Sequence, residues 1–327
     1  MLSKTNIQQH MTSNSKQNKY TTYKRPILLK VEAPQLTFPL LAGLIDGDGH
    51  IIPRKYSGEI RLVGHQLDLP LFSQLQKQFG GEVRKEAKKK AIRFFLNIKN
   101  ASGGRQGLIK FVLGLNGHIR NNIRVEQFKK LCLALNIDYK PANPINLEDG
   151  YIAGVFISDG SVFMKSSHSA ATQRLIAKPF GKPITKNPKV TSLPSCPEKI
   201  ADWASLAIKP DILKNKIERV FKGTALSIVI RIANKHIVNL ADFPKALTFG
   251  KIVHDSRGWY SFMIYHKSDI LAFSEYMEKN RTLSVKHKRL DLVKKVYYYI
   301  ENKANFPGAD IGLVAEWLST VQKWYEE

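Results

Sequence analysis

Residues 41–49 read Leu-Ala-Gly-Leu-Ile-Asp-Gly-Asp-Gly, an apolar run that ends in alternating aspartates and glycines. The pattern predicts a helix that ends on a carboxylate. Thr37 is a suitable N-cap for this helix. Pro39 suits its first turn, because the missing N–H would have no partner there. Gly49 is expected to end the helix in the left-handed conformation.

A second stretch has the same design. Residues 152–160 read Ile-Ala-Gly-Val-Phe-Ile-Ser-Asp-Gly, and Asn146 is the expected N-cap upstream. The Ala-Gly and Asp-Gly pairs have the same spacing in both stretches, and the length of a small domain separates Asp48 from Asp159. An offset of this size indicates a duplicated domain rather than a short repeat.

The small residues predict how the two helices meet. Adjacent small residues let two helix backbones approach closely. If the helices pack side by side in the same direction, Asp48 and Asp159 become neighbours at two negative helix ends. Two such carboxylates repel each other unless a cation lies between them. All-oxygen sites of this kind suit Mg²⁺. A single helix ending in Asp-Gly would need no such site, but the matched pair favours one.

The first stretch closely resembles the signature motif of the LAGLIDADG homing endonucleases, and residues 152–160 resemble a degenerate second copy. The resemblance implies an α+β fold, a pseudo-twofold duplicated αββαββα chain that is monomeric and places a saddle of antiparallel strands on DNA. It also implies that Asp48 and Asp159 bind the catalytic metals. Gly47 and Ser158, which precede these acids, are included in the expected metal site. Ile157 stands where the first motif has Asp46, which argues against Asp46 as an essential ligand.

The composition favours a polyanionic partner. The 327 residues include 51 Lys and Arg against 27 Asp and Glu, which gives a net charge of +24. Nucleic acid is the expected partner of such a chain, and a merely basic soluble enzyme is the alternative. No apolar run is long enough to span a bilayer. Cys132 and Cys196 have no Cys or His partner at metal spacing, so neither a zinc site nor a disulfide framework is supported.

The expected organisation has five parts. They are a disordered basic arm (residues 1–33), the first repeat (34–140), a linker (141–145), the second repeat (146–302) and a C-terminal helical extension (303–327). The arm has no acidic residue before Glu32. A transit peptide and the remnant of an upstream reading frame are both consistent with that composition.

The second repeat is expected to carry an insertion. Similar late helices begin near Arg124 and Arg289, and these two positions lie much further apart in the sequence than Asp48 and Asp159 do. The difference places an insertion at about residues 167–222, in the first hairpin of the repeat. Long segments of this kind are either functional or disordered, so extra DNA contacts and plain disorder are the two alternatives.

Phosphodiester hydrolysis requires an activated water, a neutralised phosphate and a stabilised leaving oxygen, which two-metal sites supply. The resemblance implies a basic residue just before the late helix of each repeat, where it would stabilise charge in the transition state. Lys286 is the first candidate and Arg120 the second. It also implies a polar residue near the water on the first hairpin. Gln66 matches that type, with Asn234 as its rough counterpart.

The strands are expected to read DNA. Period-two alternation gives each strand one apolar face and one polar face, and a two-stranded ribbon fits the major groove. The expected DNA-binding residues are Arg54, Lys55, Arg61, His65, Arg84 and Arg93 in the first repeat, and Lys165, Arg231, His254 and Arg257 in the second. A basic residue on an exposed strand is often only solvated, so it is the number of these residues that favours DNA binding.

The expected function is a site-specific homing endonuclease that makes metal-dependent double-strand cuts in a long DNA target. The alternatives are an intron RNA maturase, alone or with cleavage activity, and a DNA-binding regulator without the chemistry. The retained acid pair, Asp48 and Asp159, favours cleavage. No flanking splicing segment is recognisable, which disfavours an intein. The resemblance implies a mitochondrial location, with the chloroplast as the alternative.

Overall fold

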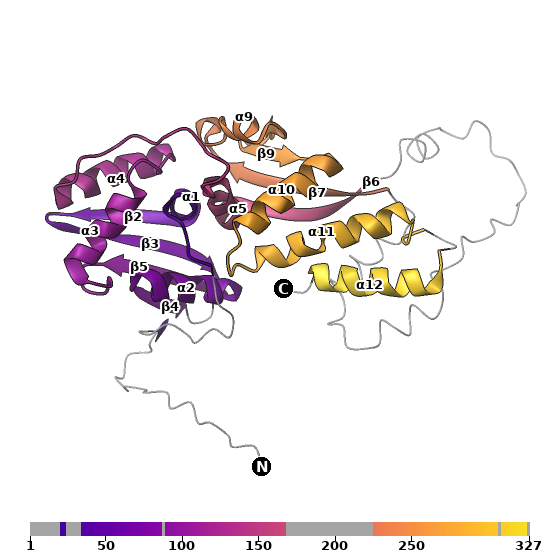
Figure 1. The fold of residues 1–327 in the computed structure, drawn as a ribbon, viewed down its shortest axis with the longest axis horizontal. Coiled ribbons are helices and arrows are strands. Elements are labelled where there is room, and N and C mark those ends of the chain that lie inside the picture. The colour runs from indigo at the N-terminus through magenta and orange to yellow at the C-terminus, as the bar shows by residue number, and fades with distance from the viewer. Residues whose placement is uncertain (1–19, 24–33, 87–88, 168–224, 307–308, 326–327) are drawn as a thin grey trace, which may run out of the picture.

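The computed structural model describes residues 20–23, 34–86, 89–167, 225–306 and 309–325. Most of the expected arm and nearly all of the expected insertion at 167–222 lie outside the described residues. Within these ranges the chain forms two similar halves that meet at a central pair of helices (Figure 1).

The first half follows the expected αββαββα order and adds one further helix. Its elements are α1 (Phe38–Asp48), β2 (Gly49–Arg54), β3 (Ser57–His65), α2 (Leu69–Phe79), β4 (Glu82–Glu86), β5 (Ala91–Asn97), α3 (Gly104–Leu115) and α4 (Asn122–Leu135). A short 3-10 turn, η1 (Gln66–Asp68), connects β3 to α2.

The second half repeats the order. Its elements are α5 (Tyr151–Asp159), β6 (Gly160–Ser167), β7 (Ala225–Asn234), the 3-10 turn η2 (Ile237–Asn239), α9 (Phe243–Leu247), β8 (Lys251–His254), β9 (Tyr260–Ile264), α10 (Lys267–Lys279) and α11 (Lys286–Glu301). The last helix, α12 (Ile311–Tyr325), packs against α11. The predicted duplicated α+β architecture is confirmed.

Each half contains one antiparallel sheet. The strand orders are β1-β4-β5-β3-β2 in the first half and β6-β7-β9-β8 in the second. Strand β1 (Tyr20–Tyr23) pairs with β4, with Tyr20 opposite Glu86. The prediction of a disordered arm is therefore wrong for these four residues. The reason is that β4 would otherwise be an open edge, and Tyr-Thr-Thr-Tyr has high strand propensity.

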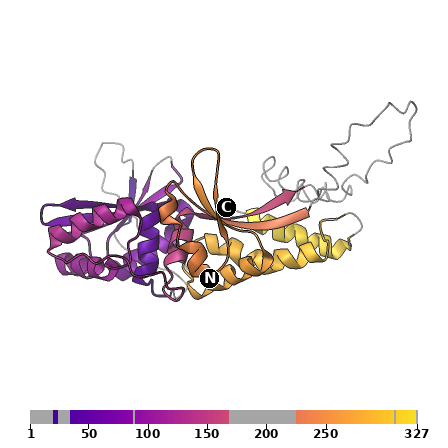
Figure 2. The same ribbon diagram turned by 90° about the horizontal axis from the view of Figure 1, so that it is seen from above.

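Both sheets cover their inner face with helices and leave the outer face open. In β5, Ile92, Phe94 and Leu96 are fully buried, whereas the alternate residues Arg93 and Phe95 are only half-buried. Figure 2 shows the strands of both halves along one side of the molecule and the helices along the other. The two open faces therefore lie on the same side, as a saddle on DNA requires.

In the central pair of helices, the backbones of α1 and α5 are in direct contact. A Cβ built on Gly43 of α1 would lie 2.2 Å from the carbonyl oxygen of Tyr151, and one on Gly154 of α5 would lie 2.0 Å from that of Leu40. Only glycine fits at either place. The expected side-by-side packing in one direction is confirmed, since contacts advance together along both helices.

The helix ends differ partly from expectation. Thr37 caps α1 as predicted, because its hydroxyl accepts from Leu40 N at 3.4 Å. Gly49 is not left-handed: its backbone is extended, at φ −84° and ψ 162°, because β2 begins there directly. Asn146 does not cap α5. It accepts from Glu148 N in a preceding turn, and Gly150, at φ 77°, stands before the first residue of the helix.

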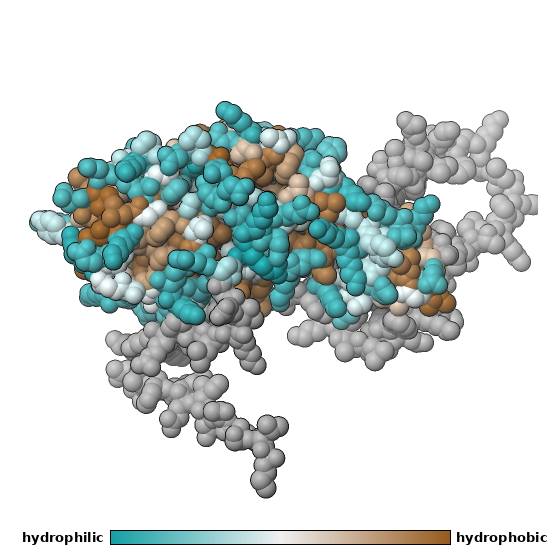
Figure 3. Space-filling view, viewed as in Figure 1, coloured by the Kyte–Doolittle hydropathy of each residue, from teal (hydrophilic) through white to brown (hydrophobic). Residues whose placement is uncertain are grey.

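The surface is largely polar. On the face shown in Figure 3, hydrophilic residues separate several smaller hydrophobic patches. None of the helices in the described ranges has both the length and the apolar character needed to cross a membrane.

Candidate active site

The two motif acids lie at the paired C-terminal ends of α1 and α5. A Cβ on Gly47 would lie 1.9 Å from Ser158 Oγ and 3.2 Å from Asp159 Oδ2. The end of α1 therefore touches the end of α5, and Asp48 follows Gly47 immediately. The structure brings Asp48 and Asp159 together, although they belong to different repeats of the sequence.

Both carboxyl groups have raised pKa values. Burial raises the pKa of Asp159 to about 6, and the nearby charge of Asp48 adds to the shift. The pKa of Asp48 is also raised, first by burial and then by the charge of Asp68. Asp48 is open to solvent on one side, but protein atoms crowd its other sides and partly desolvate it. Lys286 and Arg124 act in the opposite direction on both acids.

Lys286 is the cation of the site that the sequence predicted. It is the first residue of α11, and its Nζ donates to Phe156 O at 3.2 Å and to Ser158 O and Gly160 O at 2.7 Å each. Burial lowers its pKa to about 8, while Asp48, Asp68 and Asp159 favour the charged form. The ammonium group thus neutralises the negative end of α5 beside Asp159.

Arg120 does not have the expected position. Its guanidinium lies over the ring of Tyr151, 4.9 Å from the centroid, and donates to Asn143 O in the linker. Its backbone N–H donates to Asp46 Oδ2 at 2.7 Å. The side chain therefore ties the linker to α5 instead of facing the two motif acids, since the loop before α4 turns it toward Tyr151.

Arg124, in the first turn of α4, supplies the cation on that side. Its charge interacts with Asp46, Asp159 and Asp48, and burial lowers its pKa. Nη1 donates to Gln127 Oε1 at 3.2 Å. Arg124 was not among the expected residues, because the resemblance implied a basic residue before the helix. Its position in the first turn of the late helix is the sequence feature that could have identified it.

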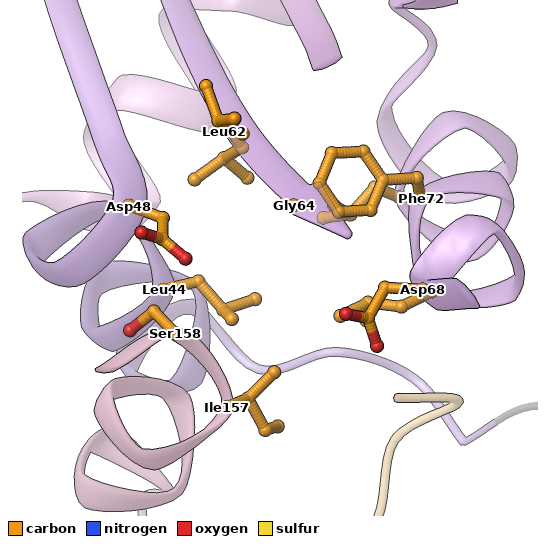
Figure 4. Close-up of a pocket in the computed structure, with 11 residues that line it drawn as sticks. Leu44, Asp48, Leu62, Gly64, Asp68, Phe72, Ile157 and Ser158 are labelled. Carbon is orange, nitrogen blue, oxygen red and sulfur yellow. The ribbon is translucent and has the colours of Figure 1, made fainter. Parts of the chain in front are cut away.

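Asp68 is a third acid near Lys286, beside Asp48 and Asp159, and it was not among the expected residues. Its carboxylate and that of Asp48 face the same pocket, which Leu62, Phe72 and Ile157 also line (Figure 4). Oδ1 of Asp68 accepts from Ser284 Oγ at 2.8 Å and from Val285 N at 3.0 Å. No local pattern indicates this contact, because both partners belong to the second repeat.

Of the two polar candidates on the hairpins, Asn234 has its side chain engaged elsewhere, and Gln66 does not line the pocket that holds Asp48. Gln66 begins η1, its N–H donates to Lys90 O at 3.0 Å, and it does not line the pocket that holds Asp48. Asn234 Oδ1 accepts from His236 N and from Asn239 Nδ2, both at 3.0 Å, and so holds the turn after β7. The two contacts of Asn234 direct its side chain to that turn and not to the motif acids.

The donor set fits a divalent cation held by the two acids. Gly47 has no side chain to cover Asp159, so that carboxylate can be reached from the end of α1. Ser158 contributes less: its hydroxyl donates to Gly154 O and Val155 O, and its carbonyl accepts from Lys286. Among the described residues, no three or more His, Cys, Asp or Glu side chains lie close enough together to hold a metal ion. A cation here would therefore complete its coordination with other oxygens, such as water and substrate phosphate.

The outer face of the first sheet carries three of the expected DNA-binding arginines. Arg61 and Arg84 both lie over the ring of Phe95, at 5.4 and 4.7 Å from its centroid, and Arg93 is opposite Arg84 in the register. Each arginine is paired with a glutamate on the same face: Glu59 with Arg61, Glu82 with Arg84 at 2.9 Å, and Glu86 with Arg93 at 2.5 Å. The glutamates were not anticipated, and they hold the guanidinium groups in fixed orientations.

The remaining candidates of the first repeat lie at the ends of β2 and β3. Arg54 and Lys55 are exposed at the hairpin between these strands, where Lys55 Nζ lies 5.4 Å from the ring centroid of Tyr56. His65 ends β3, and its Nδ1 accepts from Leu67 N at 3.4 Å. The hairpin end is free to contact DNA, whereas His65 is partly occupied in capping η1.

In the second sheet the candidates separate onto different faces. Lys165 is exposed and Arg231 lies on the outer face, where its Nε donates to Ser261 Oγ at 2.9 Å. His254 is opposite Tyr260, on the face of Ile252 and Phe262 that packs on the helices, although His254 itself is exposed near the end of the hairpin. The expectation that His254 lies on the DNA-reading face is wrong, because the register of the β8–β9 hairpin places it on the opposite face.

Arg257 lies in the turn between β8 and β9, at the end of a hairpin that projects from the sheet (Figure 2). Asp255 holds the turn: it accepts from the backbone N–H of Arg257 and Trp259 and pairs with the Arg257 guanidinium at 2.9 Å. These contacts lower the pKa of Asp255 to about 2.

Comparisons with known sequences find related intron-encoded proteins, although no protein-family model matches the chain. It is 27% identical over 288 residues to the "Intron-encoded RNA maturase bI4" of Saccharomyces cerevisiae. It is 25% identical over 293 residues to the "Probable intron-encoded endonuclease aI2" of Debaryomyces hansenii. Each alignment covers 87% of this chain, which spans only 36% and 37% of these two relatives. An "Intron-encoded DNA endonuclease ai2b" of Dictyostelium discoideum is 23% identical, over 82% of this chain and 81% of its own.

Solved structures share the fold over nearly the whole chain. I-SmaMI bound to an uncleaved DNA target in the presence of calcium ions superposes with a TM-score of 0.55 at 15% identity, covering 89% of this chain and all of that one. I-SmaMI bound to cleaved DNA gives a TM-score of 0.51, with 90% of this chain covered. The LAGLIDADG meganuclease I-AabMI also superposes over most of the chain. At this level of identity the likeness concerns the fold.

Proposed function

We propose that this chain, which has the two-repeat LAGLIDADG homing endonuclease fold, is a site-specific endonuclease that makes double-strand cuts in DNA. The observation that carries the proposal is the contact between the ends of α1 and α5, with one acid from each repeat beside it. One acid per repeat fits two cuts, one in each strand.

The relatives support the same function. Two of them are named as intron-encoded endonucleases, and structures of I-SmaMI hold uncleaved and cleaved DNA. Because the chain spans about a third of the first two relatives, their activities do not transfer directly. The acid pair is the independent support from this chain.

Asp48 and Asp159 would bind the metal, and we propose Mg²⁺. When bound, the metal supplies an activated water and neutralises the scissile phosphate. Burial raises the pKa of both acids, and the charge of Asp48 adds to the shift at Asp159, so a cation beside them would stabilise their ionised forms. Lys286 and Arg124 add positive charge beside the acids, where they would stabilise the charge that develops on the phosphate.

The outer faces of the two sheets would bind the target DNA. Arg61, Arg84 and Arg231 lie on these faces, with guanidinium planes held by glutamates or by Ser261. Held guanidinium groups suit bidentate contacts to guanine in the major groove. The hairpin ends with Arg54 and Arg257 lie where phosphate contacts would fix the register.

Assistance of intron splicing is the second candidate. It is favoured by the S. cerevisiae relative, which is named as an RNA maturase and aligns over 87% of this chain. The two functions do not exclude each other, because splicing requires an RNA surface rather than the acid pair.

We also propose that the chain is encoded in an intron of a mitochondrial gene. Its relatives are intron-encoded, and a 28% identical protein of Schizosaccharomyces pombe is named after the second intron of cox1. Localisation of the tagged protein in cell fractions tests this proposal, and recovery outside mitochondria would contradict it.

Cleavage of a randomised DNA library tests the function directly. With Mg²⁺ the chain is expected to release fragments that share one long site, and with EDTA it is expected to release none. Intron RNA added to parallel samples tests splicing. A chain that binds DNA or accelerates splicing but never cuts the library would leave the maturase as the better account.

A further inference from the structure

We propose that Asp68, an acid of the first repeat, is a positioning residue for Lys286 of the second repeat. The proposal rests on the endonuclease function above and assigns Asp68 a place in that active site. It is carried by the contacts between Asp68 and the segment that leads into α11.

Asp68 is buried and bonded across the repeat boundary. The residue is 7% exposed, and one carboxylate oxygen accepts from both Ser284 Oγ and Val285 N. It makes no capping hydrogen bond to α2, the helix that follows it directly. The carboxylate therefore binds the second repeat and not the helix that follows it in the sequence, which indicates that its function is this contact between the repeats.

The segment that Asp68 binds leads directly into α11 and so sets the position of Lys286, the first residue of that helix. Ser284 Oγ, which donates to Asp68, also accepts from Lys286 N at 3.3 Å, and Ser284 N donates to Thr282 Oγ1 at 3.2 Å. Val285, at the N-cap position of α11, provides no capping side chain of its own. Asp68 therefore supplies the carboxylate that a helix N-terminus favours, and it does so from the first repeat.

Because the start of α11 is held in place, the side chain of Lys286 is held beside the motif acids. Its Nζ donates to three carbonyl oxygens at the end of α5, which fixes its charge beside Asp159. Figure 4 shows Asp68 on the other side of the same pocket from Asp48. The cation of one centre thus depends on an acid that belongs to the other repeat.

The described part of the first repeat has a related contact but no lysine: Asn239, which ends η2 as Asp68 ends η1, accepts through its Oδ1 from Asn122 N at the start of α4, at 3.3 Å. There, Asn121 Nδ2 donates to Asp46 O at 2.9 Å, at the end of α1 that corresponds to the lysine site on α5. Only the lysine side of the site depends on Asp68. Loss of Asp68 should therefore slow one of the two strand cuts more than the other.

Asp242 provides a matched control for Asp68. It precedes α9 as Asp68 precedes α2, and each stands two residues before a proline, although Asp68 ends η1 whereas Asp242 comes after η2. Asp242 is exposed, however, and it makes no capping hydrogen bond. Substitution of Asp242 tests loss of an acid directly before the corresponding helix of the second repeat, without loss of the contact to α11.

The experiment measures nicked and linear products from a supercoiled plasmid that carries the target site. Asp68→Ala is expected to accumulate nicked plasmid and to slow the second cut on the order of 10-fold or more, with DNA affinity unchanged. Asp242→Ala is expected to cut as the wild type does. Asp68→Asn, which keeps an acceptor for Ser284 and Val285, should recover most of the rate. Because both residues act through one interaction, Asp68→Ala combined with Lys286→Ala should be no slower than Lys286→Ala alone.

A second readout does not require cleavage. The rate at which an amine reagent acetylates Lys286, followed by mass spectrometry, should rise in Asp68→Ala and stay unchanged in Asp242→Ala. If Lys286 is acetylated faster in Asp68→Ala but the wild type does not cut DNA, the endonuclease function is contradicted and the positioning role of Asp68 is retained. A folded Asp68→Ala that cuts both strands normally, or whose effect multiplies with that of Lys286→Ala, would overturn the positioning role. If Asp68→Ala does not fold, Ser284→Ala replaces it, with the same expected results.

Discussion

Two aspartates of one motif, separated by a single glycine, serve different purposes. Asp48 faces solvent at the end of α1, whereas Asp46 is buried between the two repeats. Oδ2 of Asp46 accepts from the Tyr151 hydroxyl and from Arg120 N, both at 2.7 Å. Asp46 therefore joins α1 to α5 and to the loop before α4, which accords with the absence of an acid at its counterpart, Ile157.

Asp46→Asn is expected to gain stability over the wild type as the pH rises. The substitution keeps an oxygen for Tyr151 and Arg120 but cannot ionise. Burial raises the pKa of Asp46 to about 6, well above its ordinary value of 3.8. Between these two values the unfolded wild type releases a proton that the folded chain retains, so the wild type loses stability relative to the variant as pH increases.

The measurement is urea unfolding in EDTA at about pH 4.5 and about pH 7. The difference in unfolding free energy between Asp46→Asn and the wild type should shift by ~2 kcal/mol in favour of the variant at the higher pH. The absolute difference at one pH also contains the cost of burying an amide N–H, so the shift is the quantity that decides. A difference that is the same at both pH values would mean that Asp46 does not ionise in this range.

At the scale of elements, the contact between α1 and α5 sets the geometry of the site. Gly43→Ala and Gly154→Ala would each drive a methyl group into backbone of the partner helix. Backbone cannot rotate away as a side chain can, so each variant is expected to lose about 2 kcal/mol or more of stability and most of its cleavage activity. Gly312→Ala is the control, because Gly312 is exposed near the start of α12 and its added methyl would meet only the side chain of Asp310. Thermal unfolding and cleavage rates of the three variants check this, and wild-type behaviour of Gly43→Ala would contradict the close packing.

The second sheet gives a paired test of which face contacts DNA. Arg231→Ala should weaken binding of the target DNA by about 10-fold, because Arg231 lies on the outer face. His254→Ala should bind as the wild type does, since His254 lies on the opposite face against Tyr260. Fluorescence anisotropy with a labelled target measures both. An equal loss of DNA affinity in the two variants would contradict the assignment of DNA binding to the outer face of the second sheet.

At the scale of the whole molecule, the net charge of +24 requires strongly salt-dependent DNA binding. Each phosphate that the protein neutralises releases counterions, so affinity falls steeply with salt concentration. For a long target with six or more phosphate contacts, the affinity should fall on the order of 10³-fold between about 50 and about 200 mM salt. Titrations at several salt concentrations give the slope, and a flat dependence would contradict a large charged interface.

The sequence was sufficient for features that repeat or that depend on near neighbours. The duplicated motif predicted the fold and the meeting of Asp48 with Asp159, and the segment before the last helix of the fold pointed to Lys286. Asp68 escaped prediction because its partners lie far along the chain, in the other repeat. His254 and Gly49 were misjudged because strand register and the immediate start of β2 determine their conformations, and neither is visible in a local pattern.

The most direct test of the account compares DNA cleavage by the wild type, Asp48→Asn and Asp159→Asn, in Mg²⁺ and in EDTA. The control is Asp46→Asn, which changes an acid of the same motif that faces away from the site. The account predicts double-strand cuts in Mg²⁺ by the wild type and the control. It predicts no cuts in EDTA, and a loss of at least about 10²-fold in each of the other two variants. Cleavage at the wild-type rate by Asp48→Asn or Asp159→Asn would contradict the central claim that these two acids form the active site.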